Sequence, residues 1–197
     1  MPKGVQRSEQ EFKKRQLEIA HIAAELFFEQ GFNETSVSQV AKAAKIGKST
    51  LYDFFSNKDE IILLLLDEPL EEIRGRAREI SKLPQSTFLR IAQILHMHLG
   101  VLSRDKALIL KLFIEWQRLP VSVQAKHEIQ RKAYQDILIS LIEEGIMSES
   151  FRPVNPDVVV KTLLSILSSV LMTSRPSSSS EEMLDQALDI ILKGIQR

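Results

Sequence analysis

Apolar residues recur along most of this chain at spacings of three and four, which is the period of an amphipathic α-helix. Over 12–30, Ile19, Ala23 and Phe27 lie on one face, and Gly31 follows as a stop signal. The same period predicts further helices over residues 36–44, 48–55, 56–82, 85–103, 105–118, 121–147, 155–173 and 181–195. With seven glycines and seven prolines in 197 residues the chain has few breaks, and we predict an all-α fold.

Two of the predicted helices are much shorter than the others and lie three residues apart. The first begins at Ser36, which has capping-box spacing to Gln39. In the second, Leu51 and Phe55 share one face and polar side chains occupy the rest. A helix, a tight turn and a short exposed helix is the arrangement in which a second helix enters the major groove of DNA. The pattern therefore predicts a helix-turn-helix over about 36–55.

Two features interrupt the longer segments. Pro69 should kink or interrupt the predicted helix over 56–82, because a proline removes one backbone hydrogen bond and its ring crowds the preceding turn. The serine-rich stretch over 174–180 predicts a mobile loop between the last two helices.

The predicted helix over 155–173 is apolar nearly all round its circumference. A thin bundle of one chain cannot cover such a helix on every side, so a second copy of the chain is a natural partner. Small polar side chains would allow that partner to approach closely: Thr162, Ser165, Ser169 and Thr173. A central helix in a monomeric bundle is the alternative explanation of the same pattern.

The chain carries 26 basic and 26 acidic residues, so net charge alone argues against a polyanionic partner. The distribution softens this objection, because residues 1–58 hold nine Lys and Arg against seven Asp and Glu. Lys48 and Lys58 each lie in the first turn of a predicted helix, where the helix dipole disfavours a cation by about 0.3–1 kcal/mol. A DNA phosphate beside each helix start would reverse that preference. A solvated lysine that tolerates the penalty is the alternative.

Little in the composition suggests catalysis. The absence of cysteine excludes disulfides, thiolate metal sites and cysteine nucleophiles. His96 and His98 are two residues apart, so on a helix they point about 200° away from each other and cannot hold one metal ion together. No phosphate-binding loop, metalloprotease motif or hydrolase motif is present, and we expect no enzyme, no cofactor and no metal. We expect a cytoplasmic protein without a membrane span, because no secretory signal is visible and the apolar runs are short.

Several motif positions follow one another in order between Phe12 and Ile73. They are Gly31-Phe32, Thr35-Ser36-Val37, the Ala-Lys-Ala-Ala of 41–44, Lys48-x-Thr50-Leu51-Tyr52-x-x-Phe55 and Lys58-Asp59-Glu60. In these positions the chain resembles the DNA-binding domain of the TetR family of bacterial transcriptional regulators. Three residues depart from the family pattern. Lys45 stands where a glycine commonly ends the first helix, Gly47 where a serine commonly caps the second, and Ser49 where a glycine is common. Two outcomes are therefore open: Lys45 adopts a mildly strained left-handed conformation, or the turn differs slightly from that of the family.

The resemblance implies an N-terminal three-helix DNA-binding domain, at 13–73, and a C-terminal helical bundle, at 74–197, that binds an effector and dimerises. We predict a sequence-specific transcriptional regulator of palindromic double-stranded DNA, acting as a homodimeric repressor that a small molecule releases. The predicted DNA-binding residues are Thr35, Ser36, Gly47, Lys48, Ser49, Thr50, Tyr52 and Lys58. Ser49, Thr50 and Tyr52 would enter the DNA groove, and Gly47 would allow the start of the helix to approach the DNA closely. Contacts with the DNA phosphate backbone, which position the protein, would come from Thr35, Ser36, Lys48, Tyr52 and Lys58.

The effector is expected in a mostly apolar pocket of the helices between 56 and 147, with polar anchors at His96, Glu115 and Trp116. No motif identifies the effector. Two alternatives remain open at this stage. One is a DNA-binding factor that needs no ligand, and the other is a small-molecule-binding helical bundle with a vestigial DNA domain.

Overall fold

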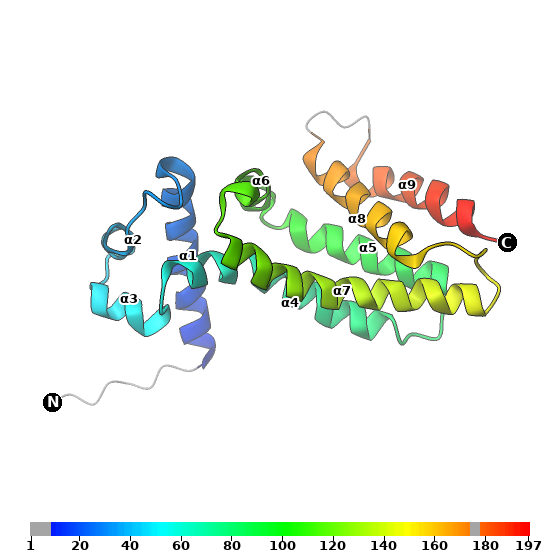
Figure 1. Ribbon diagram of the computed structural model, residues 1–197, viewed down its shortest axis with the longest axis horizontal. Helices are drawn as coiled ribbons and strands as arrows, with labels where there is room; N and C mark the ends of the chain where they lie inside the picture. The colour runs from blue at the N-terminus through cyan, green and yellow to red at the C-terminus, as the bar shows by residue number, and fades with distance from the viewer. Residues whose placement is uncertain (1–8, 174–177) are drawn as a thin grey trace. The chain divides into compact units, whose positions relative to one another are not determined.

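The computed structural model describes residues 9–173 and 178–197. Within these ranges the chain forms α-helices joined by turns, with no β-strand, so the all-α prediction is confirmed. The elements are α1 (Glu9–Gln30), α2 (Val37–Ala43), α3 (Lys48–Phe54), α4 (Lys58–Ile80), α5 (Thr87–Ser103), α6 (Lys106–Glu115), the 3-10 turn η1 (Trp116–Arg118), α7 (Val121–Met147), α8 (Pro156–Met172) and α9 (Ser180–Ile195) (Figure 1). Most of the loop predicted over 174–180 lies outside the described residues.

Local sequence signals set the boundaries of α2. Ser36 is its N-cap, and the predicted capping box is present. The Gln39 backbone N–H donates to Ser36 Oγ at 3.2 Å, and the Ser36 N–H donates to Gln39 Oε1 at 2.8 Å. After α2, Lys45 has a φ of 56°, so of the two open outcomes the left-handed conformation is the one observed. Gly31 ends α1 with a φ of 97°, a conformation that favours glycine.

α4 continues through Pro69, and the prediction that this proline interrupts the helix is wrong. Pro69 has no N–H to donate to the Leu65 carbonyl, so the backbone ladder of α4 has one hydrogen bond fewer at this point. The chain divides into two compact units, and the boundary along α4 falls between Glu68 and Pro69. The weakened turn of α4 therefore coincides with the boundary.

Each unit is built from two separate stretches of the chain. The first contains the described residues up to Glu68 together with Lys111–His127, and the second contains Pro69–Leu110 together with Glu128–Arg197. The domain boundary predicted after residue 73 stays a prediction, and it assigns the whole turn between α6 and α7 to the second domain. In the structure that turn belongs to the first unit.

Polar contacts attach the segment Lys111–His127, which contains the end of α6, the following turn and the start of α7, to α1 and to the first half of α4. Side chains at the turn that face the interior are buried, among them Leu112, Leu119 and Val123. The polar pairs are Lys111–Glu25 (3.1 Å), Ser122–Asp59 (3.0 Å) and His127–Asp67 (2.7 Å). The turn is thus tied to the same helix that begins at Lys58.

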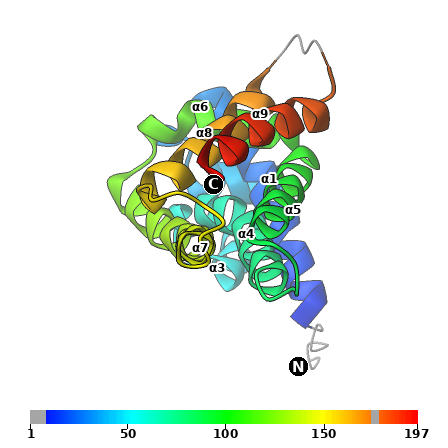
Figure 2. The same ribbon diagram turned by 90° about the vertical axis from the view of Figure 1, so that its right-hand side faces the viewer.

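In the second unit, α5, α8 and α9 pack on one another, and α8 and α9 lie side by side (Figures 1 and 2). Apolar side chains of α8 are buried within the single chain: Val159, Val160, Leu163, Leu167, Val170 and Leu171. The premise that one chain cannot cover α8 is therefore wrong for most of its apolar surface. An outer stripe of α8 remains exposed and consists of Val158, Thr162, Ser165, Ser169 and Met172.

The end of α9 is fastened to the turn between α7 and α8. Phe151 forms an isolated antiparallel bridge with Gln196, and the Arg152 N–H donates to the Ile195 carbonyl at 2.7 Å. The Phe151 ring is buried against the backbone of Gly145 in α7. A Cβ at Gly145 would lie 2.2 Å from this ring, so the close approach requires glycine.

Candidate nucleic-acid interface

α3 has a buried face and an exposed polar face. Leu51, Phe54 and Phe55 are buried, and Phe54 stacks on Phe12 of α1 with ring centroids 4.8 Å apart. The polar side chains predicted to face away are accessible. Lys48, Ser49, Tyr52 and Asp53 are exposed and Thr50 is half-buried. Tyr52 is 48% exposed, a large fraction for an aromatic residue, and together these five residues make a surface able to contact base edges and phosphates.

Gly47 is the N-cap of α3, with a φ of −67° that any residue can adopt. A Cβ at this position would make only ordinary contacts, the nearest at 3.6 Å to Ser49 Oγ. The fold therefore does not require glycine at 47. The role predicted for Gly47, close approach of the helix start to DNA, stays a prediction.

Thr35 and Ser36 are used in two different ways. Ser36 is exposed at the start of α2, although its hydroxyl already takes part in the capping box. Thr35 is buried, and its hydroxyl donates to the carbonyl of Gly31 at 2.8 Å. The Thr35 side chain therefore holds the connection between α1 and α2 and is not presented at the surface.

Lys58 also turns inward. Its ammonium group donates to the carbonyls of Phe32, Asn33 (3.4 Å) and Thr35 (3.1 Å), and lies 4.4 Å from the centroid of the Phe32 ring. Burial lowers the pKa of Lys58, while the neighbouring carboxylates Asp59 and Glu34 act in the opposite direction. The anionic partner that the helix start favours is thus replaced by carbonyl oxygens of the chain itself. Lys58 fastens the start of α4 to the connection between α1 and α2.

The three predicted effector anchors fall in different places. His96 in α5 lies in the second unit, where its Nε2 is 2.8 Å from Asp185 Oδ1 of α9. Glu115 and Trp116 belong to the first unit. Glu115 pairs with Arg118 (3.0 Å), and the Trp116 ring meets the His127 ring edge-on at 5.4 Å. Neither unit by itself brings the three residues together.

The structure brings together two residues that the sequence treated separately. From the sequence, His98 of α5 was weighed as a metal ligand and was not connected with Tyr134 of α7. His98 Nδ1 lies 3.0 Å from the Tyr134 hydroxyl inside the second unit. His96 and His98 have different partners, and no cluster of potential metal ligands occurs among the described residues. Sequence spacing could not have paired α5 with α7, because the pairing depends on how the two helices pack.

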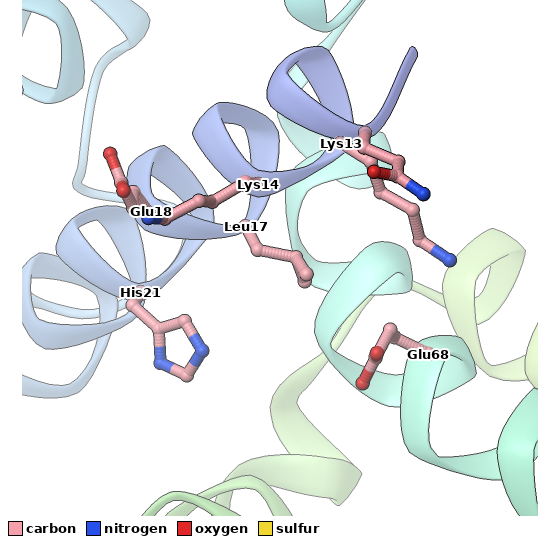
Figure 3. A pocket seen from close by; sticks show the side chains of 7 residues that line it. Lys13, Lys14, Leu17, Glu18, His21 and Glu68 are labelled. Atoms are coloured by element: carbon pink, nitrogen blue, oxygen red, sulfur yellow. The ribbon is translucent and has the colours of Figure 1, made fainter. Parts of the chain in front are cut away.

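A surface hollow lies between α1 and α4 of the first unit. It is lined by Gln10, Lys13, Lys14, Leu17, Glu18, His21 and Glu68. Figure 3 shows Leu17 projecting from α1 toward α4, where Glu68 lies. The hollow is open, and cationic and anionic side chains are mixed round it, so it provides neither an enclosed apolar cavity nor a uniformly basic surface. In the described part of the chain, no helix is both long and apolar enough to cross a membrane.

Comparison with known proteins identifies the family. The family described as bacterial regulatory proteins, tetR family, matches residues 19–65, and the tetracyclin repressor-like C-terminal domain matches residues 84–195. The chain belongs to the TetR family. The match over 19–65 covers the second half of α1, all of α2 and α3, and the first turns of α4. As predicted, this TetR-family chain is a DNA-binding transcriptional regulator with a helix-turn-helix.

TetR-family relatives and solved structures resemble the chain over most of its length. The HTH-type transcriptional repressor KstR2 of Mycolicibacterium smegmatis is 29% identical over 193 residues, or 92% of this chain and 90% of that protein. The fatty acid metabolism regulator protein of Bacillus subtilis is 26% identical over 136 residues, or 69% of this chain and 70% of that protein. Two structures share the fold. FadR of Bacillus subtilis with stearoyl-CoA has a TM-score of 0.76 at 22% identity, covering 91% of this chain and 99% of that one. AibR with isovaleryl coenzyme A and operator DNA has a TM-score of 0.70 at 19% identity, covering 90% and 98%.

Proposed function

We propose that the chain is a homodimeric transcriptional repressor that binds a palindromic operator through α3 and leaves it when an acyl-CoA thioester binds. The observation that carries the effector class is that FadR and AibR, which share the fold over nine-tenths of this chain, hold acyl-CoA thioesters. The similarity to a regulator of fatty acid metabolism supports the same class. Ser49, Thr50 and Tyr52 contact the groove, and Lys48 and Ser36 contact the phosphate backbone. Gly47 permits close approach of the helix, while Thr35 and Lys58 position α2 and α4 from within.

Hydrogen bonding along the outer stripe of α8 supports the dimer. Thr162 Oγ1 donates to the Val158 carbonyl at 2.8 Å, and Ser165 Oγ donates to the Lys161 carbonyl at 2.8 Å. Because the hydroxyls of Thr162 and Ser165 are already bonded within the helix, a second helix can cover these two residues without leaving their donors unpaired. In α9, Ile190 is an exposed apolar residue, with 76% of its surface accessible. Two copies joined through α8 and α9 would place two α3 helices for successive major grooves, about 34–36 Å apart.

Coupling between effector and DNA is proposed to pass through α4 and the turn between α6 and α7. The first half of α4 and this turn both belong to the first unit, and the His127–Asp67 and Ser122–Asp59 contacts join them. Trp116 packs against His127, and we propose that a displacement of Trp116 is transmitted to Asp67 of α4 through His127. A coupling free energy of about 1–3 kcal/mol is enough to change operator occupancy.

Lys48→Ala is expected to weaken binding to all DNA sequences to a similar extent and to reduce the slope of log K against log salt by about one. Lys58→Ala is the matched control. Because its ammonium group contacts chain carbonyls, this variant should lower the melting temperature and leave the salt slope unchanged. Titration of an operator selected from a random DNA library, at several salt concentrations, checks both results. An unchanged slope for Lys48→Ala would remove Lys48 from the interface.

A long-chain acyl-CoA is expected to reduce operator affinity by a factor of about 5–150, which is the range of typical coupling energies. Operator DNA must then reduce acyl-CoA affinity by the same factor. Fluorescence anisotropy of the labelled operator and calorimetry of the thioester measure the two factors. The free fatty acid of equal length is the control ligand. A thioester that binds tightly and leaves operator affinity unchanged contradicts the proposed release.

A further inference from the structure

Asp53 is the only acidic residue of the helix-turn-helix over 36–55, a segment that otherwise carries three lysines. It belongs to α3, and its side chain is exposed. Within residues 9–173 and 178–197, no hydrogen bond or ion pair engages the Asp53 carboxylate. The carboxylate is therefore available to a molecule outside the chain.

The stability of α3 does not explain an aspartate at this position. Asp53 is the last residue but one of the helix, and the helix dipole disfavours an anion in the last turn. Lys48 is the first residue of the same helix, where the dipole disfavours a cation. Both ends of α3 thus carry the sign of charge that weakens the helix. Because both side chains are exposed, their charges suit an outside partner better than they suit the fold.

Asp53 also lies close to the middle of the exposed face of α3. Leu51 and Phe54 mark the buried face. At about 100° per residue, the middle of the opposite face falls near Ser49, and Asp53 is only about 40° away from Ser49 round the helix. Tyr52 lies on the other side of Ser49, at about 60°. Asp53 therefore shares the face that is proposed to enter the groove.

A carboxylate discriminates between bases more sharply than the other polar groups of α3. The hydroxyls of Ser49, Thr50 and Tyr52 can donate or accept a hydrogen bond, whereas an ionised carboxylate can only accept. In the major groove, guanine and thymine present acceptors to it, and the donor of adenine stands beside the N7 acceptor. Cytosine presents its N4 amine as a donor. The cytosine amine is therefore the base group that fits Asp53.

We propose that Asp53 selects a cytosine in each operator half-site by accepting a hydrogen bond from the N4 amine in the major groove. This role rests on the proposed function, since it takes α3 to enter the groove. Lys48 then attracts all DNA alike, because it contacts phosphate. Asp53 has the opposite effect: phosphates repel it on every sequence, and only a donor placed opposite it compensates. The aspartate thus contributes specificity at the expense of general affinity.

The first test is selection of bound DNA from a random library by wild type, Asp53→Asn and Asp53→Ala. Wild type should select cytosine at one position of each half-site. Asp53→Asn should select adenine at the same position, because an amide can bond both N6 and N7 of that base. Asp53→Ala should show no preference there, and it should bind unrelated DNA more tightly than wild type because the repulsion is gone.

Titration of four operators, which differ only in the base pair at that position, gives the size of the effect. Wild type should bind the cytosine operator about tenfold more tightly than the other three, which is the usual scale for one mismatched base pair. Asp53→Ala should bind all four with similar affinity. Identical base preferences for wild type and Asp53→Asn overturn the proposal, and so does a wild-type preference for another base at the position that changes.

Glu29→Gln is the matched control, because it removes the same charge from an exposed position of α1 in the first unit. It should leave every base preference unchanged. Asp53→Asn should not lower the melting temperature, since no contact of the fold is lost; a large fall would show that the carboxylate serves the fold and would overturn the proposal. If wild type selects no palindrome, the proposed operator and the role of Asp53 fail together. A palindrome whose bases are indifferent to Asp53 removes that role alone.

Discussion

Leu167→Glu is expected to unfold the second unit and not merely to separate two intact subunits. Leu167 is only 2% exposed and lies in the core that α8 shares with α5 and α9. The change removes a buried leucine and places a carboxyl group without a partner in the same space, at a cost of about 4 kcal/mol or more. Stabilities of whole domains are about 5–15 kcal/mol, so a large share of the second unit's stability is lost. Thermal unfolding followed by circular dichroism measures the effect. A variant that melts like the wild type would contradict the position of α8.

Ile190→Glu separates the question of assembly from that of folding. Ile190 is exposed on α9, so this change should alter monomer stability by less than about 0.5 kcal/mol. It should nevertheless weaken the dimer, because the new carboxylate would be buried at the proposed interface. Ile129→Glu is the control, with 69% exposure on α7 and the same change of side chain. Sedimentation should show loss of the dimer for Ile190→Glu alone, and an unaffected dimer would remove α9 from the interface.

Gly145→Ala is the second substitution with a large expected effect, at about 1–3 kcal/mol of destabilisation. In most helices this change is favourable, because alanine loses less backbone entropy than glycine. At Gly145 the added methyl group would overlap the buried Phe151 ring, which can move only by opening the turn between α7 and α8. Phe151 also pairs with Gln196, so the displacement would reach the end of α9.

Gly75→Ala provides the comparison of opposite sign. Gly75 lies inside α4, is exposed, and has no atom within 4 Å of an added Cβ. This variant should gain about 0.5–1 kcal/mol, the usual advantage of alanine inside a helix. Urea unfolding of the two variants and the wild type checks both signs. If both substitutions stabilise the protein, Phe151 does not pack on Gly145 as described.

The features predicted well from the sequence are those decided by neighbours along the chain. The capping box at Ser36 and the left-handed turn at Lys45 each depend on four or five consecutive residues, and the structure has both. The family motif extended this success to α3, where Leu51 and Phe55 are buried and Tyr52 is exposed.

The features predicted poorly are those decided by contacts between distant residues. Lys58 carries a helix-start signal that favours an anion, but carbonyls some 25 positions earlier in the chain satisfy it. α8 looked uncovered only because the sequence does not show that α5 and α9 lie against it. His98 and Tyr134 are 36 positions apart in the sequence, and no helical spacing of residues indicates that they form a pair.

The two-stretch composition of the first unit affects how this protein can be made and dissected. A fragment that stops at Glu68 would lack Lys111–His127, and with it the polar partners of Glu25, Asp59 and Asp67. During synthesis, the ribosome must add the second unit's Pro69–Leu110 before the residues that complete the first unit emerge. The DNA-binding end of the chain thus matures late, after more than half of the polypeptide has been made. To transfer the first unit to another protein, both of its stretches are needed, the one that ends at Glu68 and Lys111–His127, with a designed linker in place of Pro69–Leu110.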